Sequence, residues 1–215
     1  MNARRLVCIV AVLLLVTPVM AQETGWVLRG RLIDIAPNDS STTIGDTGTG
    51  AAVDSAMTLE VDLTYKFNER WAVEVIAATA KHDLTTESGA LAGADAGAVT
   101  HLPPTVTLQY HFPVTGAFHP YIGAGLNYTI FYDYEISSDL RGLGLSDLDF
   151  ENSFGLAGQL GFDYDINDRW LFNVDLKYIK ISTDVDLELE GGGVLDTITV
   201  DIDPWVFGVG IGYRF

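Results

Sequence analysis

The 215-residue sequence has a single cysteine, Cys8, and it lies within the first 21 residues. The rest of the chain can therefore form neither a disulfide nor a thiolate metal site. Beyond residue 21 the sequence also lacks any run of 18 consecutive apolar residues, which a membrane-spanning helix needs. These two absences exclude a disulfide-rich secreted domain and a helical membrane protein.

Basic side chains are scarce as well. The chain has 12 Lys and Arg residues against 29 Asp and Glu residues. Such an acidic surface is a poor partner for nucleic acid or other polyanions. Because 48% of the residues are hydrophobic, the acidity does not indicate a disordered chain.

The first 21 residues predict a secretory signal peptide. Arg4 and Arg5 precede an apolar run at residues 6–16, which is too short to span a membrane. Cleavage after residue 21 would leave residues 22–215, a length typical of one domain. Export without disulfides is consistent with a bacterial envelope.

Alternation with a period of two dominates the remaining chain. In 57–67, for example, large apolar residues alternate with Thr, Glu, Asp and Lys. Strict alternation of this kind predicts strands. Eight strands are expected at residues 25–36, 57–67, 71–82, 104–113, 120–133, 153–166, 169–183 and 202–215.

Either a soluble sandwich or a transmembrane barrel can produce this alternation. The strands are about ten residues long, aromatic residues gather at their ends, and the connections alternate between short and long, as in outer-membrane barrels. The long, polar connections are 37–56, 83–102, 134–152 and 184–200. We therefore expect an all-β fold: an eight-stranded antiparallel transmembrane β-barrel in the bacterial outer membrane, with short periplasmic turns and long external loops.

The last strand, 202–215, has one face of large apolar residues and another that is mostly glycine. In lipid an open sheet edge would leave backbone groups unpaired, so this strand should pair with the first and close the barrel. Its apolar face would then contact acyl chains, and its glycines would face a narrow lumen. The terminal Phe215 resembles the address read by the bacterial outer-membrane assembly machinery.

Inward-facing positions near the periplasmic end are charged, with both signs interleaved. Charges facing a low-dielectric wall must be paired or hydrated, so we expect salt bridges that plug the lumen rather than catalytic carboxylates. The residues of this predicted charged floor are Arg29, Arg31, Glu60, Asp62, Lys66, Glu74, Asp163, Asp175, Lys177 and Arg214.

Inward positions nearer the outside are apolar instead. They predict either a pocket for an apolar ligand or side chains that simply pack on one another beneath the loops. The residues are Ile33, Ile35, Ile76, Ala78, Phe131, Ile179, Ile181 and Val206.

Three prolines lie at strand starts: Pro103, Pro104 and Pro204. Proline has no backbone donor, so it is confined to edges, strand starts and bulges. Plain strand initiation explains them. They also fit a gap in the wall through which an apolar molecule could leave sideways into lipid.

Several blocks, including "HLPPTVTLQYHF" (101–112), "HPYIGAGLNYTIFYD" (119–133) and "DIDPWVFGVGIGYRF" (201–215), resemble the OmpW family of outer-membrane barrels. The resemblance implies an apolar channel that is open to the outside, closed to the periplasm, and passes small hydrophobic molecules with lateral exit. A leucine and a tryptophan constrict the channel in that family. Their positions correspond to Ile76 and Lys177 here, and the lysine departs from the family pattern.

Two functions remain open at this point. The first is passage of small hydrophobic molecules. The second is a structural or surface-docking barrel, for bacteriocin or host contact, without transport. No serine lies near the lumen-facing His111, so an enzyme is not expected, and neither a cofactor nor a metal site is predicted. Outer-membrane lipid and lipopolysaccharide are the expected surroundings.

Overall fold

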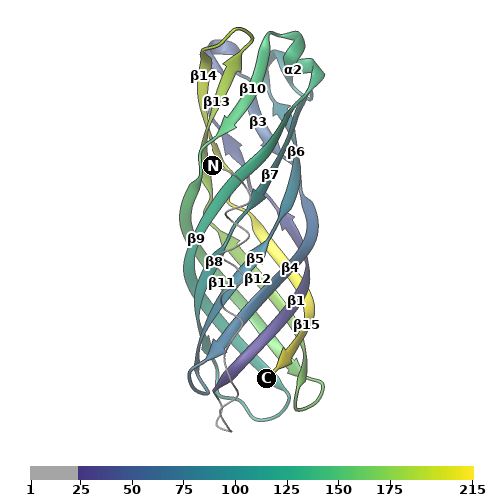
Figure 1. The fold of residues 1–215 in the computed structure, drawn as a ribbon, viewed down its shortest axis with the longest axis vertical. Helices are drawn as coiled ribbons and strands as arrows, with labels where there is room; N and C mark the ends of the chain where they lie inside the picture. Colours follow the sequence, from purple (N-terminus) through teal and green to yellow (C-terminus); the bar gives the residue numbers. More distant parts are fainter. Residues whose placement is uncertain (1–23) are drawn as a thin grey trace.

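The computed structural model describes residues 24–215, so the predicted signal peptide at 1–21 lies outside the described part. Eight long antiparallel strands form a closed barrel, because the first pairs with the last and β9 pairs with β11 (Figure 1). Around the barrel they are β1 (Gly25–Ala36), β4 (Ala56–Lys66), β5 (Trp71–Ala78), β8 (Thr105–His111), β9 (Phe118–Ile136), β11 (Ser153–Asp165), β12 (Trp170–Ile179) and β15 (Trp205–Arg214).

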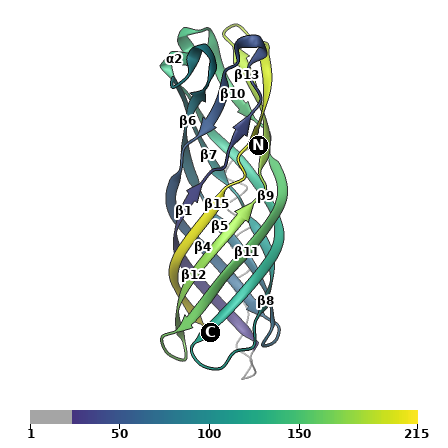
Figure 2. The same ribbon diagram turned by 180° about the vertical axis from the view of Figure 1, so that it is seen from behind.

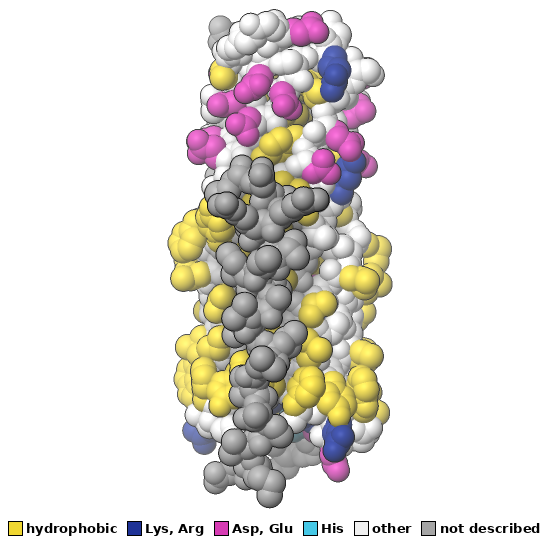
Figure 3. All heavy atoms as spheres, viewed as in Figure 1, with side chains coloured by type: hydrophobic (Ala, Val, Ile, Leu, Met, Phe, Trp, Pro, Cys, Tyr) yellow, Lys and Arg dark blue, Asp and Glu magenta, His cyan; other side chains and the backbone are white. Residues whose placement is uncertain are grey.

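The alternation of the sequence becomes the inside and outside of this barrel. Large apolar side chains such as Leu59 and Phe154 point outward and are 73% and 68% exposed, whereas their charged or small neighbours are buried inside. Figure 3 shows most of the hydrophobic side chains over the middle and lower part of the tube and most of the acidic ones above them. Such a surface is stable only against acyl chains.

The ends of the chain complete the wall. Gly30 of β1 pairs with Ile211 of β15, and the backbone N–H of Phe215 donates to the carbonyl oxygen of Trp26 over 3.0 Å. The predicted closure between first and last strands is confirmed. No backbone edge of the barrel is therefore left open along this ladder, as lipid requires.

Short turns close the periplasmic end. The side-chain oxygen of Asn68 accepts the backbone N–H groups of Arg70 and Trp71, and Asn167 does the same for Arg169 and Trp170. Asparagine makes such local turns readily because its side chain replaces a backbone acceptor.

The long external connections are largely built of strands, although the sequence marked them only as long and polar. They form an extension above the barrel that holds β2 (Ser40–Ser41), β3 (Gly50–Val53), β6 (Ala80–Glu87), β7 (Asp95–Leu102), β10 (Leu145–Phe150), β13 (Ser182–Leu189) and β14 (Val194–Asp201) (Figure 2). The extension also includes the helix α2 (Ser138–Gly142) and the 3-10 turns η3 (Gly45–Thr47) and η4 (Gly89–Leu91).

Alternation continues in these connections. In 184–190 the acids point outward, while Val185 and Leu187 are buried beside Leu148 and Ile198. This apolar core is continuous with the apolar residues of the upper lumen. No helix within residues 24–215 is long and apolar enough to cross a membrane.

Candidate functional site

Eight inward side chains form a buried ionic network across the lower lumen, and we call them the charged floor. They come from five strands, and each residue is at most 3% exposed. Because water is excluded, their charges must be paired or hydrogen-bonded within the lumen. The members are Arg29, Arg31, Glu60, Asp62, Glu74, Asp163, Asp175 and Lys177.

Arg29 joins three strands. Its Nε and Nη2 donate to the two oxygens of Asp163 over 3.2 and 2.8 Å, a bidentate pair. Its Nη1 lies 3.0 Å from Asp62 Oδ1 and 2.6 Å from Thr64 Oγ1. The fork of one guanidinium thus cross-links β1, β4 and β11, which a lysine could not do with this geometry.

Arg31 and Lys177 complete the upper layer of the floor. Arg31 pairs with Glu60 at 2.8 Å and, through Nη2, with Asp62 at 2.7 Å and Glu74 at 3.0 Å. Lys177 Nζ lies 3.0 Å from Glu60 Oε1 and 2.5 Å from Asp175 Oδ1. An ion-paired lysine therefore lies where the family resemblance suggests a tryptophan.

The glycine face of β15 makes room for the two arginines. A Cβ on Gly210 would lie 2.7 Å from Arg31 Cγ, and one on Gly212 would lie 2.8 Å from Arg29 Cγ. A Cβ on Gly210 would also lie 2.1 Å from the carbonyl oxygen of Gly30, and one on Gly212 would lie 2.8 Å from Leu171 Cδ1. The bare face of the last strand is thus explained by the arginine stems together with the backbone and the leucine packed against it.

Neutral side chains fill the remaining hydrogen-bonding positions. Gln159 Nε2 donates to Glu74 over 2.6 Å and to Asp175 over 2.8 Å. Tyr121 donates to Asp175 over 2.9 Å and is fully buried in the lumen. Although Tyr121 lies near a strand end, its side chain points inward rather than toward lipid. Together these groups separate the upper lumen from the periplasm.

Above the charged floor lies a cavity of about 20 Å³, which is room for about one water molecule. Glu60 and Lys177 form its base, and His101 and Thr105 also line it. Seven of the eight apolar residues predicted for this height line its wall: Ile33, Ile35, Ile76, Ala78, Ile179, Ile181 and Val206. The eighth, Phe131, packs against His101 and Phe150 instead.

The barrel wall is interrupted between the β5–β6 and β7–β8 segments. Ile76 pairs with Thr105 and Ala80 pairs with His101 in the same register, but no ladder pairing within the described chain joins 77–79 to 102–104. Pro103 would lie opposite Ala78 in this register, and it has no N–H to donate. Both residues line the cavity, so the interruption lies directly beside it.

We call this interruption the seam. A side-chain hydrogen bond crosses it. Thr79 Oγ1 lies 2.6 Å from the hydroxyl oxygen of Tyr132, which is on β9, beyond β7. Thr79 Oγ1 also donates to the carbonyl oxygen of His101 over 3.2 Å. On its other side, Pro104 stays joined to β9, because its carbonyl oxygen accepts the N–H of Tyr128 over 3.0 Å.

Pro204 lines the same cavity from the top of β15, opposite the seam in the strand order. Backbone hydrogen bonds join the strands around Pro204. The Ile179 N–H donates to the carbonyl oxygen of Pro204 over 3.2 Å, and the Ile202 N–H donates to the carbonyl oxygen of Ile181 over 2.8 Å. Of the three predicted gap prolines, only Pro103 lies at an unpaired stretch and lines the cavity; Pro104 does not line it.

Two histidines, His82 on β6 and His101 on β7, stack on each other beside the cavity, which His101 lines. The rings of His82 and His101 lie 4.9 Å apart and nearly parallel, at 12°. His82 Nδ1 lies 2.6 Å from the carbonyl oxygen of Asp54, while its Nε2 has no partner within residues 24–215. Burial lowers the pKa of both, that of His101 to about 3, so both are neutral near pH 7.

Two residues predicted for the floor lie below it. Lys66 and Arg214 are only partly buried, and they line a larger opening at the periplasmic mouth. Arg214 pairs with Asp165, which also accepts from His119 over 2.9 Å. Within residues 24–215, no group of three or more His, Cys, Asp or Glu side chains is arranged to hold a metal ion.

A closed eight-stranded barrel with an apolar outer belt, a sealed ionic interior and short turns at one end is an outer-membrane β-barrel. Comparison with known proteins identifies the family of this barrel. A sequence model of the OmpW family matches residues 22–215, and the chain belongs to that family.

Similar proteins share the whole length of the chain. Outer membrane protein W of Vibrio cholerae is 38% identical and covers 99% of this chain and 100% of its own. The crystal structure of OprG from Pseudomonas aeruginosa has a TM-score of 0.83 at 35% identity, covering 92% of this chain and 99% of that one. A Pseudomonas aeruginosa protein named for the dibenzothiophene metabolism operon, PahQ, is 29% identical over 99% of both chains.

Proposed function

We propose that this barrel passes small hydrophobic molecules from the outside into the upper lumen and releases them sideways, through the seam, into the membrane. The observation that carries the proposal is the cavity lined by isoleucines above a sealed charged floor, directly beside an unpaired stretch of wall. An apolar molecule there meets apolar walls, and the ionic network below it opposes its passage into the periplasm.

The family relationship supports a hydrophobic cargo. The relative PahQ is named for an operon of dibenzothiophene metabolism, and dibenzothiophene is an apolar aromatic molecule. The predicted lining residues, from Ile33 to Val206, would be the path, and Pro103 would mark the exit. Because the cavity holds only about 20 Å³ here, passage requires these side chains and the seam to move apart.

The experiment is uptake of a fluorescent apolar probe by liposomes that contain the folded barrel. Ile76→Asp should abolish uptake above the protein-free background, because it places a carboxylate on the wall of the cavity. Phe131→Asp should do the same, because it buries a carboxylate in the apolar core that is continuous with that wall. Ile76→Leu preserves the apolar surface and is the matched control. Uptake that survives both aspartate substitutions would contradict the proposal.

A second candidate, a structural or surface-docking barrel without transport, is favoured by the near-complete filling of the upper lumen. The same assay separates the two functions. If the wild-type barrel gives no uptake above protein-free liposomes while it is folded, the docking function is the better description.

A further inference from the structure

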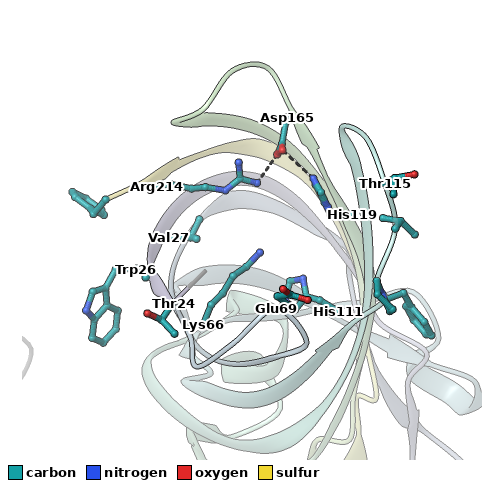
Figure 4. A pocket seen from close by; sticks show the side chains of 15 residues that line it. Thr24, Trp26, Val27, Lys66, Glu69, His111, Thr115, His119, Asp165 and Arg214 are labelled. Atoms are coloured by element: carbon teal, nitrogen blue, oxygen red, sulfur yellow. Dashed lines mark hydrogen bonds and ion pairs between the residues drawn. The ribbon is translucent and has the colours of Figure 1, made fainter. Parts of the chain in front are cut away.

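A second and larger cavity plays no part in the proposed passage. It lies at the periplasmic mouth of the barrel and has a volume of about 560 Å³ (Figure 4). We call it the periplasmic vestibule. Its wall comes from the first residues of β1, the last of β4, β8, β11 and β15, and the turn at 113–115. A volume of this size is ordinary for a small-molecule site.

The vestibule is separated from the upper lumen by the charged floor. Arg29 and Asp163, which cross the lumen just above it, are completely buried. A molecule in the vestibule therefore arrives from the periplasm and not through the barrel. This makes the vestibule independent of the proposed uptake path.

One wall of the vestibule presents an ammonium group that forms no direct ion pair within the described chain. Lys66 points into the cavity (Figure 4), and it has no hydrogen bond or ion pair with any residue from 24 to 215. The neighbouring carboxylates are already engaged, since Asp163 is held by Arg29 and Asp165 by Arg214. A partly buried ammonium in this position is most stable with an anionic oxygen beside it.

His111 also lines the vestibule, and its ring has a buried nitrogen without a partner in the described chain. His111 is 4% exposed, and its Nδ1 has no hydrogen-bond partner in the described chain. Its Nε2 lies 3.1 Å from Gln109 Oε1, and the amide nitrogen of Gln109 donates to Glu74 over 2.9 Å. The Gln109 oxygen is thus the acceptor, so Nε2 carries the proton and the neutral ring offers Nδ1 as an acceptor.

Leaving a buried polar atom unpaired costs about 1–3 kcal/mol. A ligand that supplies a hydroxyl donor to His111 Nδ1 would remove that cost, just as an anionic oxygen would satisfy Lys66. Val27, Pro113 and Val114 add apolar surface beside these two groups. The required ligand therefore combines an anionic oxygen, a hydroxyl group and a short apolar body.

We infer that the periplasmic vestibule binds a small hydroxy carboxylate, with its carboxylate on Lys66 and its hydroxyl donating to His111 Nδ1. Glu69, on the exposed turn after β4, also lines the vestibule and opposes the binding of an anion. Removing the Glu69 carboxylate should therefore strengthen binding of the ligand, whereas removing the Lys66 ammonium should weaken it. Opposite effects of these two changes are what a negatively charged ligand requires.

The experiment uses the folded barrel in zwitterionic micelles and follows backbone NMR shifts during titration with the three hydroxybenzoate isomers, benzoate and phenol. At least one hydroxybenzoate should saturate shifts around Lys66 and His111 and bind more tightly than benzoate or phenol. Equal affinity for benzoate and the best hydroxybenzoate would remove the role assigned to His111. Shifts confined to the extension, or no saturable shift, would overturn the site.

Single substitutions test the proposed contacts with Lys66 and His111 separately. Lys66→Gln should weaken binding about tenfold, as expected for a lost charged hydrogen bond. Lys81→Gln makes the same change at the opposite end of the barrel and should leave binding unchanged. Glu69→Gln should tighten binding about twofold. His111→Phe should abolish the preference for hydroxybenzoate over benzoate; if this variant does not fold, the ligand comparison on the wild type tests the same contact.

Discussion

The hydroxyl groups of Thr79 and Tyr132 lie 2.6 Å apart, so a side chain from β9 reaches past β7 to the junction of β5 and β6. The bond spans the seam, where the ladder between Ile76–Thr105 and Ala80–His101 is interrupted. A single neutral hydrogen bond contributes only about 1 kcal/mol. It can hold such a seam closed and still break often.

Tyr132→Phe should therefore accelerate release of an apolar probe into the membrane. If breaking this bond is part of the opening step, its loss is expected to raise the rate about fivefold. Tyr128→Phe removes a hydroxyl from a neighbouring exposed position on the same strand and should not change the rate. The measurement is stopped-flow fluorescence of probe transfer into liposome lipid. Equal rates for both variants and the wild type would show that the Thr79 contact does not hold the seam.

One of the three prolines singled out in the sequence, Pro103, lies at the seam, but nothing in the sequence indicates the bond that crosses it. Pro103 marks an unpaired position by its missing N–H, which is a local property of the residue. The Thr79–Tyr132 contact depends on strand register across β7, and register is fixed by the whole barrel. The predicted strand 71–82 likewise gave no indication that the ladder breaks at Thr79, between β5 and β6.

Lys177 is expected to be essential for stability. Lys177→Met would leave the carboxylates of Glu60 and Asp175 without their ammonium partner in a sealed lumen. Breaking a buried ionic pair costs about 3–5 kcal/mol. Urea unfolding in lipid vesicles should show a loss of this size.

Two further variants test whether the lost stability comes from the broken ion pairs of Lys177. The double variant Glu60→Gln with Lys177→Met should be less destabilised than the sum of the single variants, because the pair is coupled. Lys81→Met removes a lysine that pairs with Glu135 where both side chains are about half exposed, and it should change stability little. Additive losses in the double variant would mean that Lys177 contributes packing rather than charge.

The close approach of strands at Gly155 gives a prediction about packing. A Cβ there would lie 1.8 Å from the carbonyl oxygen of Lys180, whereas a Cβ on the outward-facing Gly158 would touch nothing within 4 Å. Gly155→Ala should destabilise the barrel by about 1–3 kcal/mol, because the backbone must shift. Gly158→Ala should stay within about 0.5 kcal/mol. Equal unfolding midpoints for the two variants would contradict this packing.

The inside and outside of the barrel follow from the sequence because a period of two assigns each side chain a face. Height along the barrel is harder to assign, since strand ends are uncertain by a few residues. Lys66 and Arg214 lie at such ends, and the structure places them in the vestibule rather than in the charged floor. The sequence did not predict the strands of the extension, because the outward-facing acidic residues make 184–200 resemble a solvated loop.

The stacked pair of His82 and His101 predicts that acid weakens the extension. Burial lowers the pKa of both, that of His101 to about 3, whereas the unfolded chain has a histidine pKa of about 6.5. Between these two values the unfolded state binds more protons, so the unfolding free energy should fall as the pH drops through this window. His101→Phe keeps a stacking ring without a titrating group, so its stability should depend less on pH. Unfolding midpoints measured near pH 7 and near pH 4 check this, and an equal acid-induced loss in wild type and variant would show that the pair does not control it.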